Sequence, residues 1–140
     1  MGEEVGEQVI TMDTSALVAL MDRREARHEG VRSALFADTG PYLLPAAILS
    51  EVAYLIELRV GSHALDPLLG DLEDGLLSFE CGEEDMGRVR ALVTRYADLP
   101  LGLSDAAVIA CGERNGGKVL TLDRRDFDVV AREGAITLLP

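Results

Sequence analysis

The chain has 140 residues, which is enough for one domain with a full hydrophobic core but too few for two ordinary domains. Hydrophobic residues make up 48% of the sequence, and no run approaches the roughly 18 apolar residues of a membrane span, so composition excludes a disordered chain and a membrane-spanning one. The formal net charge is −12, from 13 basic and 25 acidic residues. The surplus of acidic residues repels nucleic-acid phosphates at long range, but a metal site made of carboxylates produces the same acidic composition.

The N-terminal segment is acidic and polar and lacks the basic and apolar regions of a signal peptide, so we expect a cytoplasmic protein. Residues 1–7 have the composition of a flexible tail, and residues 8–140 that of a single domain. Two cysteines cannot build a disulfide scaffold, and Cys111, on an apolar helical stripe, is expected to be a small buried thiol. The positions of Cys81, His28 and His63 support neither a zinc site nor a hydrolase triad.

Short β-rich runs alternate with longer helical patterns along the chain, which is typical of an α/β fold. The strongest helix pattern covers residues 46–60 and stops at Gly61. Ser104 is expected to cap a later helix, which the glycines after Asn115 end. In chain order, the sequence predicts strands at 8–12, 42–44, 76–80, 118–122 and 135–138, with helices at 16–21, 28–38, 46–60, 62–74, 83–97 and 104–113.

Acidic residues follow two of the predicted strands directly. Asp13 comes after the first strand and Asp123 after the fourth. Strands separated by helices favour a parallel sheet, whose ligand crevice lies outside the carboxyl ends of the strands. If these two strands are neighbours, the two carboxylates meet in that crevice. The alternatives are local, since Asp13 can cap the following helix and Asp123 can stabilise a turn.

Two further acids stand on predicted helices. Glu51 lies three residues after Ile48, on or beside a core-facing stripe, where a carboxylate is costly unless it is paired or binds a cation. Alternatively, Glu51 sits at the edge of the stripe and reaches water. Asp105 stands in the first turn of its helix, where the helix dipole favours the ionised form. Four clustered carboxylates would repel one another, and Mg²⁺ or Mn²⁺, which prefer oxygen ligands, would relieve that repulsion.

Four segments of the chain, taken in their order and spacing, resemble the PIN domain family and, within it, the VapC-type ribonuclease toxins. None of the segments is specific alone, but together they cover essentially residues 9–140; they read MDTSALVAL, LSEVAYL, LSDAAVIACGERNG and LTLDRRDFDVV. The resemblance implies a three-layer α/β/α sandwich around a five-stranded parallel sheet with the strand order 3-2-1-4-5. That order places the first and fourth strands side by side, in agreement with the argument for the two aspartates.

The resemblance also implies a set of site residues and partners. The residues expected to be catalytic and to coordinate Mg²⁺ or Mn²⁺ are Asp13, Glu51, Asp105 and Asp123. Thr14, Ser15 and Thr121 would support them, and Asp126 and Asp98 are further candidates. The implied partners are RNA as substrate, a cognate antitoxin protein and a second copy of the chain. Surplus apolar positions in residues 46–74 also favour a homodimer, among them Leu55, Leu58, Leu65, Leu68 and Leu69.

The leading interpretation is a Mg²⁺- or Mn²⁺-dependent endoribonuclease of the VapC toxin type. Arginines outside the acidic centre would hold the RNA backbone, and the candidates are Arg23, Arg24, Arg27, Arg124 and Arg125. The alternatives are a PIN nuclease that is not a toxin and a PIN-fold binding module with weak or no catalysis. With only two histidines in the chain, cleavage by the 2′-hydroxyl lacks its usual acid and base, so we expect metal-assisted hydrolysis instead.

Overall fold

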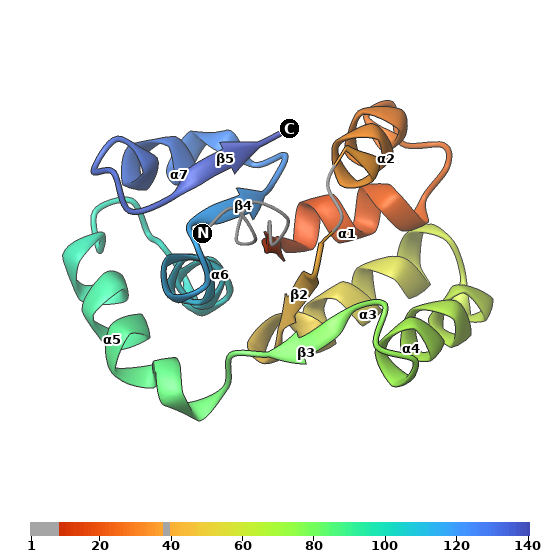
Figure 1. Cartoon of the computed structure of the whole chain (residues 1–140), viewed down its shortest axis with the longest axis horizontal. Coiled ribbons are helices and arrows are strands. Elements are labelled where there is room, and N and C mark those ends of the chain that lie inside the picture. Colours follow the sequence, from red (N-terminus) through yellow and green to blue (C-terminus); the bar gives the residue numbers. More distant parts are fainter. Residues whose placement is uncertain (1–8, 38–39) are drawn as a thin grey trace, which may run out of the picture.

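The computed structural model describes residues 9–37 and 40–140, and the predicted tail at residues 1–7 lies outside these ranges. An all-parallel, five-stranded sheet crosses the domain in the predicted order, β3-β2-β1-β4-β5 (Figure 1). The strands are β1 (Ile10–Met12), β2 (Tyr42–Pro45), β3 (Ser78–Glu80), β4 (Lys118–Leu120) and β5 (Thr137–Leu139).

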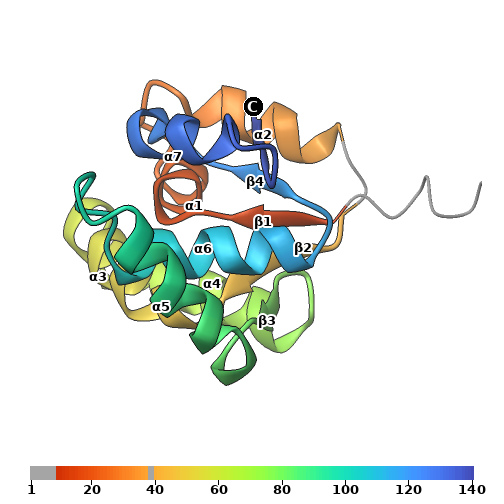
Figure 2. The same ribbon diagram turned by 90° about the vertical axis from the view of Figure 1, so that its left-hand side faces the viewer.

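Helices cover both faces of this sheet (Figures 1 and 2). One face carries α1 (Thr14–Met21), α2 (His28–Phe36), α3 (Leu49–Arg59) and α4 (Leu65–Glu73). The other carries α5 (Met86–Arg95) and α6 (Leu103–Arg114), and α7 (Arg124–Ala131) packs beside β5. Short 3₁₀ turns precede three of the helices, at Ala46–Ile48, Ser62–Ala64 and Glu83–Asp85. None of the helices in the described residues is long and apolar enough to cross a membrane.

The helix α6 lies in the centre of the domain and fixes one wall of the site. Its residues 106–112 are all buried. Gly112 permits this close packing, because a Cβ built there would lie only 2.6 Å from a methyl carbon of Val119 on β4. The first turn of α6 carries Asp105, so the packing of the helix against the sheet sets the position of that carboxylate.

Three predictions about local structure were wrong. The helix α7 was not predicted, because its eight residues are dominated by charge and bury mainly Phe127 and Val130. Gly102, rather than Ser104, occupies the N-cap of α6, so the serine lies inside the first turn. The strand β4 ends at Leu120, two residues earlier than expected, and the residues that follow it turn into the site.

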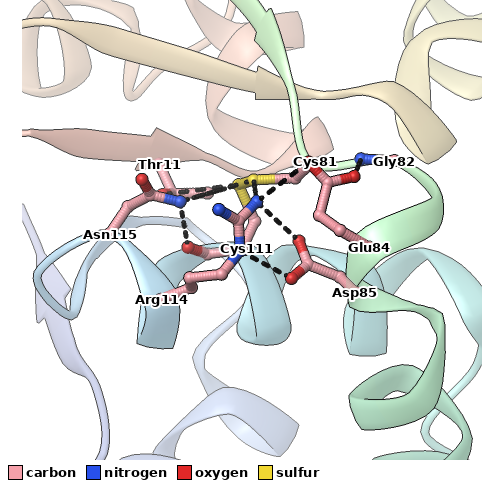
Figure 3. Close-up of a disulfide and its surroundings, with 8 residues drawn as sticks. All are labelled: Thr11, Cys81, Gly82, Glu84, Asp85, Cys111, Arg114 and Asn115. Carbon is pink, nitrogen blue, oxygen red and sulfur yellow. Dashed lines mark hydrogen bonds and ion pairs between the residues drawn. A yellow bond between two sulfur atoms is a disulfide. The ribbon is translucent and has the colours of Figure 1, made fainter.

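The expectation that Cys111 is a free thiol was also wrong, because its sulfur is bonded to Cys81 (Figure 3). The bridge joins the residue after β3 to the central helix α6, with 5.5 Å between the two Cα atoms. Arg114 and Asn115 each donate to the sulfur of Cys81 at 3.4 Å. The two cysteines are 30 residues apart, and only the packing of the β3 end against α6 brings them together.

Reducing this disulfide is expected to destabilise the fold. Opening a loop of this length returns chain entropy to the unfolded state, and the loop-entropy relation predicts a loss of about 3.7 kcal/mol of unfolding free energy. Urea unfolding with and without dithiothreitol measures the change. The double variant Cys81→Ala, Cys111→Ala is the control, since its midpoint should not respond to the reductant. An unchanged midpoint for the wild-type chain would contradict the prediction.

Candidate active site

Asp13 lies at the centre of the site, at the point where β1 leaves the sheet. Its N–H donates to the carbonyl of Leu120 at 3.0 Å, so the chain remains beside β4 up to this residue. The side chain is 3% exposed and occupies the N-cap position of α1 without making a side-chain capping bond. Its Oδ2 instead accepts from the hydroxyls of Thr121 at 2.7 Å and Ser15 at 2.9 Å. The capping alternative therefore explains the position of Asp13 but not the contacts of its carboxylate.

The two hydroxyls that bind Asp13 also hold the chain that follows β4. The backbone N–H of Leu122 donates to Ser15 Oγ at 2.9 Å, and that of Asp123 donates to Thr121 Oγ1 at 3.0 Å. The hydroxyls themselves are 3.3 Å apart. This network links the residues after β1 to those after β4 and orients the buried carboxylate.

Glu51 reaches the site from the first turn of α3. Its Oε1 accepts from the hydroxyl of Thr14 at 2.7 Å, and the residue is exposed. Glu51 therefore stands at the edge of the apolar stripe, which is the second of the two interpretations drawn from the sequence. Its contact with Thr14 connects α3 to the beginning of α1.

The four predicted carboxylates share the lining of one cavity of about 250 Å³. These residues are Asp13, Glu51, Asp105 and Asp123, and each belongs to a separate segment of the chain. Burial raises the pKa of Asp13, against the lowering effect of its hydroxyl bonds. Burial, followed by the charges of Asp13, Asp123, Asp126 and Glu51, raises the pKa of Asp105 to about 6. The carboxylates therefore lie within electrostatic reach of one another.

The two further candidates differ in position. Asp126 is buried in the first turn of α7 and accepts from Arg125 at 3.3 Å; it does not line the cavity, although its charge acts on Asp105. Asp98 is exposed between α5 and α6 and lies outside the lining. The structure thus brings Asp126 near the centre and leaves Asp98 apart from it.

The arginines at the cavity differ from those predicted. Of the five candidates only Arg27 lines it, and Arg124 and Arg125 instead face Asp128 and Asp126 on α7. Arg59, at the end of α3, lines the cavity but was not predicted, and Glu25 was missed as well. The signal for Arg59 was its position eight residues after Glu51, which places both on one side of a helix.

The donor set fits a hard divalent cation. Carboxylate and hydroxyl oxygens surround the cavity, and Mg²⁺ and Mn²⁺ prefer such ligands. Within residues 9–37 and 40–140, however, no three Asp, Glu, His or Cys side chains already stand in a metal-binding arrangement. A bound cation would relieve the repulsion among the carboxylates that contributes to the raised pKa of Asp105.

Comparisons with known proteins agree with this fold. The family model of the PIN domain matches residues 10–133. The chain is 31% identical over 133 residues to Ribonuclease VapC26 of Mycobacterium tuberculosis, which spans 92% of this chain and 98% of that protein. The chain therefore belongs to the PIN domain family, within its VapC group. Its fold is similar to that of Mycobacterium tuberculosis VapC20, a sarcin-ricin loop cleaving toxin, as seen in the crystal structure of that protein. The TM-score is 0.79 at 20% sequence identity, and the match covers 94% of this chain and 99% of the VapC20 chain.

The raised pKa of Asp105 predicts how stability changes with pH when metal is removed by EDTA. In the folded protein the carboxyl group of Asp105 keeps its proton up to about pH 6, whereas in the unfolded chain it loses the proton near its ordinary pKa of 3.8. Because the unfolded chain releases the proton more easily, Asp105 lowers the free energy of unfolding as the pH rises from about 3.8 to 6. Asp105→Asn removes the effect. Thermal melts should show a variant more stable than wild type at neutral pH, with a smaller difference in mildly acidic buffer.

Asp98→Asn provides the matched control, because it removes an exposed carboxylate outside the cavity. Its melting temperature should follow that of the wild type across the pH range. A difference between Asp105→Asn and wild type that does not depend on pH would show that Asp105 carries no such electrostatic cost.

Proposed function

We propose that this chain is a Mg²⁺- or Mn²⁺-dependent endoribonuclease that hydrolyses RNA phosphodiester bonds and acts as a VapC-like toxin. The observation that carries the proposal is the convergence of four carboxylates on one cavity, at the edge of the sheet where β1 and β4 end. Membership of the PIN domain family supports the same reaction. We expect it to act in the cytoplasm.

The residues of the chain would divide the work between them. Asp13, Glu51, Asp105 and Asp123 would hold the cation, which when bound would supply positive charge to the scissile phosphate and lower the pKa of an attacking water. Ser15 and Thr121 fix one oxygen of Asp13 and so orient its carboxylate toward a ligand in the cavity. Thr14 orients Glu51 in the same way from the facing helix.

The positions of the histidines determine which products we expect. The Nδ1 atom of His28 lies 2.8 Å from the carbonyl of Ala19, and His63 belongs to the 3₁₀ turn before α4. Neither lines the carboxylate cavity. Attack by the 2′-hydroxyl therefore lacks a histidine acid and base there. Attack by water in line with the 3′ oxygen leaves a 5′-phosphate and a 3′-hydroxyl.

We propose two protein partners, a cognate antitoxin and a second copy of the chain. The relationship to VapC proteins supports the first. Apolar side chains left exposed on α3 and α4 support the second, and they include Tyr54 at 63%, Leu58 at 67% and Leu69 at 50% exposure. Leu68, which was counted among the surplus positions, is instead buried in the core.

Replacing a central carboxylate should abolish RNA cleavage without unfolding the protein. Asp13→Asn and Asp105→Asn should each lower the rate on bacterial ribosomal RNA by at least about 100-fold, because ligand loss exceeds the effect of losing a supporting contact. Asp98→Asn, outside the cavity, should cleave like wild type. Gel assays in Mn²⁺, with circular dichroism of each variant, measure both properties.

The ends of the cleaved RNA test the proposed mechanism separately from the identity of the residues. The wild-type chain should leave 5′-phosphate and 3′-hydroxyl ends, and excess EDTA should stop cleavage. Cyclic phosphate ends, or cutting that continues in EDTA, would refute the metal mechanism and the assignment of the four carboxylates.

A further inference from the structure

One side of α3 runs along the cavity and carries opposite charges at its two ends. Glu51, Leu55 and Arg59 follow one another at intervals of four residues, and all three line the cavity. Eight residues of an α-helix span about 12 Å. The helix therefore places the backbone of Arg59 more than two turns from that of Glu51, which contributes its carboxylate to the acidic centre.

The guanidinium of Arg59 has no partner among residues 9–37 and 40–140. No hydrogen bond or ion pair of this side chain is found there, although several carboxylates line the same cavity. Arg27, the other arginine of the lining, differs in this respect, because its Nε donates to Glu25 Oε1 at 2.8 Å. The charge of Arg27 is thus compensated locally, whereas that of Arg59 is available to a ligand.

The backbone of Arg59 is tied to the turn between α1 and α2. A guanidinium nitrogen of Arg24 donates to the carbonyl of Arg59 at 2.5 Å, and Arg24 also faces Asp22 at 3.5 Å. This contact docks the turn onto the end of α3, so Arg27 and Arg59 lie along the same cavity. The carboxyl end of a helix is itself unfavourable for an anion, so an anion there would need the arginine side chains.

We propose that Arg59 binds a phosphate of the RNA strand that flanks the scissile one, with Arg27 as a weaker second contact. This inference rests on the proposed function, since it concerns how the same site holds its substrate. A guanidinium can make two parallel hydrogen bonds to one phosphate. A chain with a net charge of −12 repels RNA at long range and needs such local cations close to its acidic centre. The spacing along α3 assigns Arg59 to a neighbouring nucleotide rather than to the group that reacts.

Binding of a fluorescein-labelled RNA stem-loop, followed by anisotropy, tests the inference without requiring cleavage. Ca²⁺ would replace Mn²⁺ in the assay, because its looser coordination should support hydrolysis poorly. Arg59→Gln should weaken binding about tenfold, as expected for a lost hydrogen bond between charged groups. It should also reduce the slope of log affinity against log salt by about 0.7, the value for one phosphate contact of a single strand. Arg59→Lys should keep most of the salt slope.

Arg132→Gln is the matched control. Arg132 stands at the C-cap of α7, is exposed and does not line the cavity, so its loss removes the same charge from a comparable helix end. The Arg132→Gln variant should bind RNA like wild type. Arg27→Gln should weaken binding only two- to threefold, or by about 0.4 to 0.7 kcal/mol, because Glu25 already compensates the charge of Arg27.

Wild-type affinity and salt slope in Arg59→Gln would overturn the inference while leaving the proposed function intact. Weaker binding with an unchanged salt slope would also overturn it, since the loss would not be that of a phosphate contact. The alternative ligand of Arg59 is an acidic polypeptide, and polyglutamate is the probe for it. If binding of polyglutamate requires Arg59 and binding of RNA does not, the residue belongs to a protein interface. A wild-type chain that neither binds nor cleaves RNA would overturn both proposals.

Discussion

The pairing of β1 with β4 is the constraint on which the site depends. Met12 lies opposite Leu120 in parallel register, and the N–H of Asp13 continues the contact by donating to the Leu120 carbonyl. Both strands then leave the sheet at the same edge, and Thr121 is brought within 2.7 Å of the Asp13 carboxylate. The other groups of the site are arranged around this junction, since the hydroxyl of Ser15 spans it.

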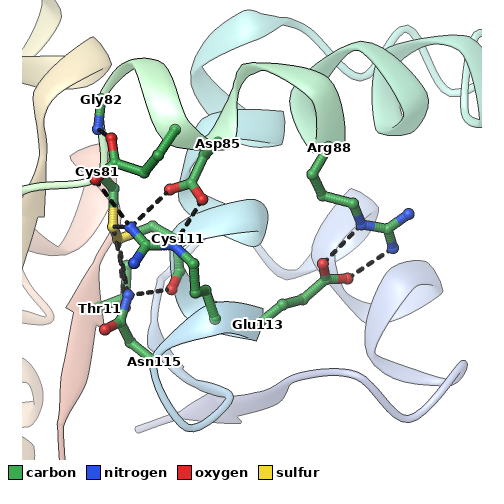
Figure 4. Close-up of polar contacts among 10 residues, drawn as sticks. Thr11, Cys81, Gly82, Asp85, Arg88, Cys111, Glu113 and Asn115 are labelled. Carbon is green, nitrogen blue, oxygen red and sulfur yellow. Dashed lines mark hydrogen bonds and ion pairs between the residues drawn. A yellow bond between two sulfur atoms is a disulfide. The ribbon is translucent and has the colours of Figure 1, made fainter.

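The cost of this junction is electrostatic, because it gathers acids that proteins normally keep apart. Within residues 9–37 and 40–140, no arginine forms an ion pair with Asp13, Glu51, Asp105 or Asp123, although Arg27 and Arg59 line the same cavity. Arg114 donates to Asp85 at 2.7 Å (Figure 3) and Arg88 donates to Glu113 at 2.7 Å (Figure 4). Glu113 and Arg114 belong to the last turn of α6, whereas Asp105 belongs to its first turn. With these cations engaged elsewhere, hydroxyl groups supply the contacts of the buried carboxylate. The carboxylates of the cavity therefore keep a negative potential suited to a divalent cation, and the two arginines of its lining, Arg27 and Arg59, are exposed.

Much of the fold could be predicted because its signals are local. The positions of Asp13 and Asp123 after apolar runs indicated two strand ends, although β4 ends at Leu120, three residues before Asp123. The resemblance to PIN domains gave the sheet order that makes these strands neighbours, and the structure confirms that order. The helix α7 was missed because it is short and half of its eight residues are charged, although Phe127 and Val130 are buried on one side of it.

The remaining features depend on contacts that the sequence does not display. The bond between Cys81 and Cys111 exists because the end of β3 packs on α6, and no spacing rule connects positions 30 residues apart. Likewise, Arg59 belongs to the site only because α3 runs along the cavity, whereas Arg124 and Arg125 follow a site residue in sequence but face the acids of their own helix. Proximity in sequence was a poor guide for long side chains.

The most direct test of the central claim is anomalous scattering from crystals of the wild-type chain grown with Mn²⁺. A Mn²⁺ peak should lie in the cavity between Asp13, Glu51, Asp105 and Asp123, with carboxylate oxygens as its protein ligands. The supporting hydroxyls of Ser15 and Thr121 should remain on Asp13. A cavity without a peak at saturating Mn²⁺, or a peak held by other residues, would contradict the claim that these carboxylates form a metal centre.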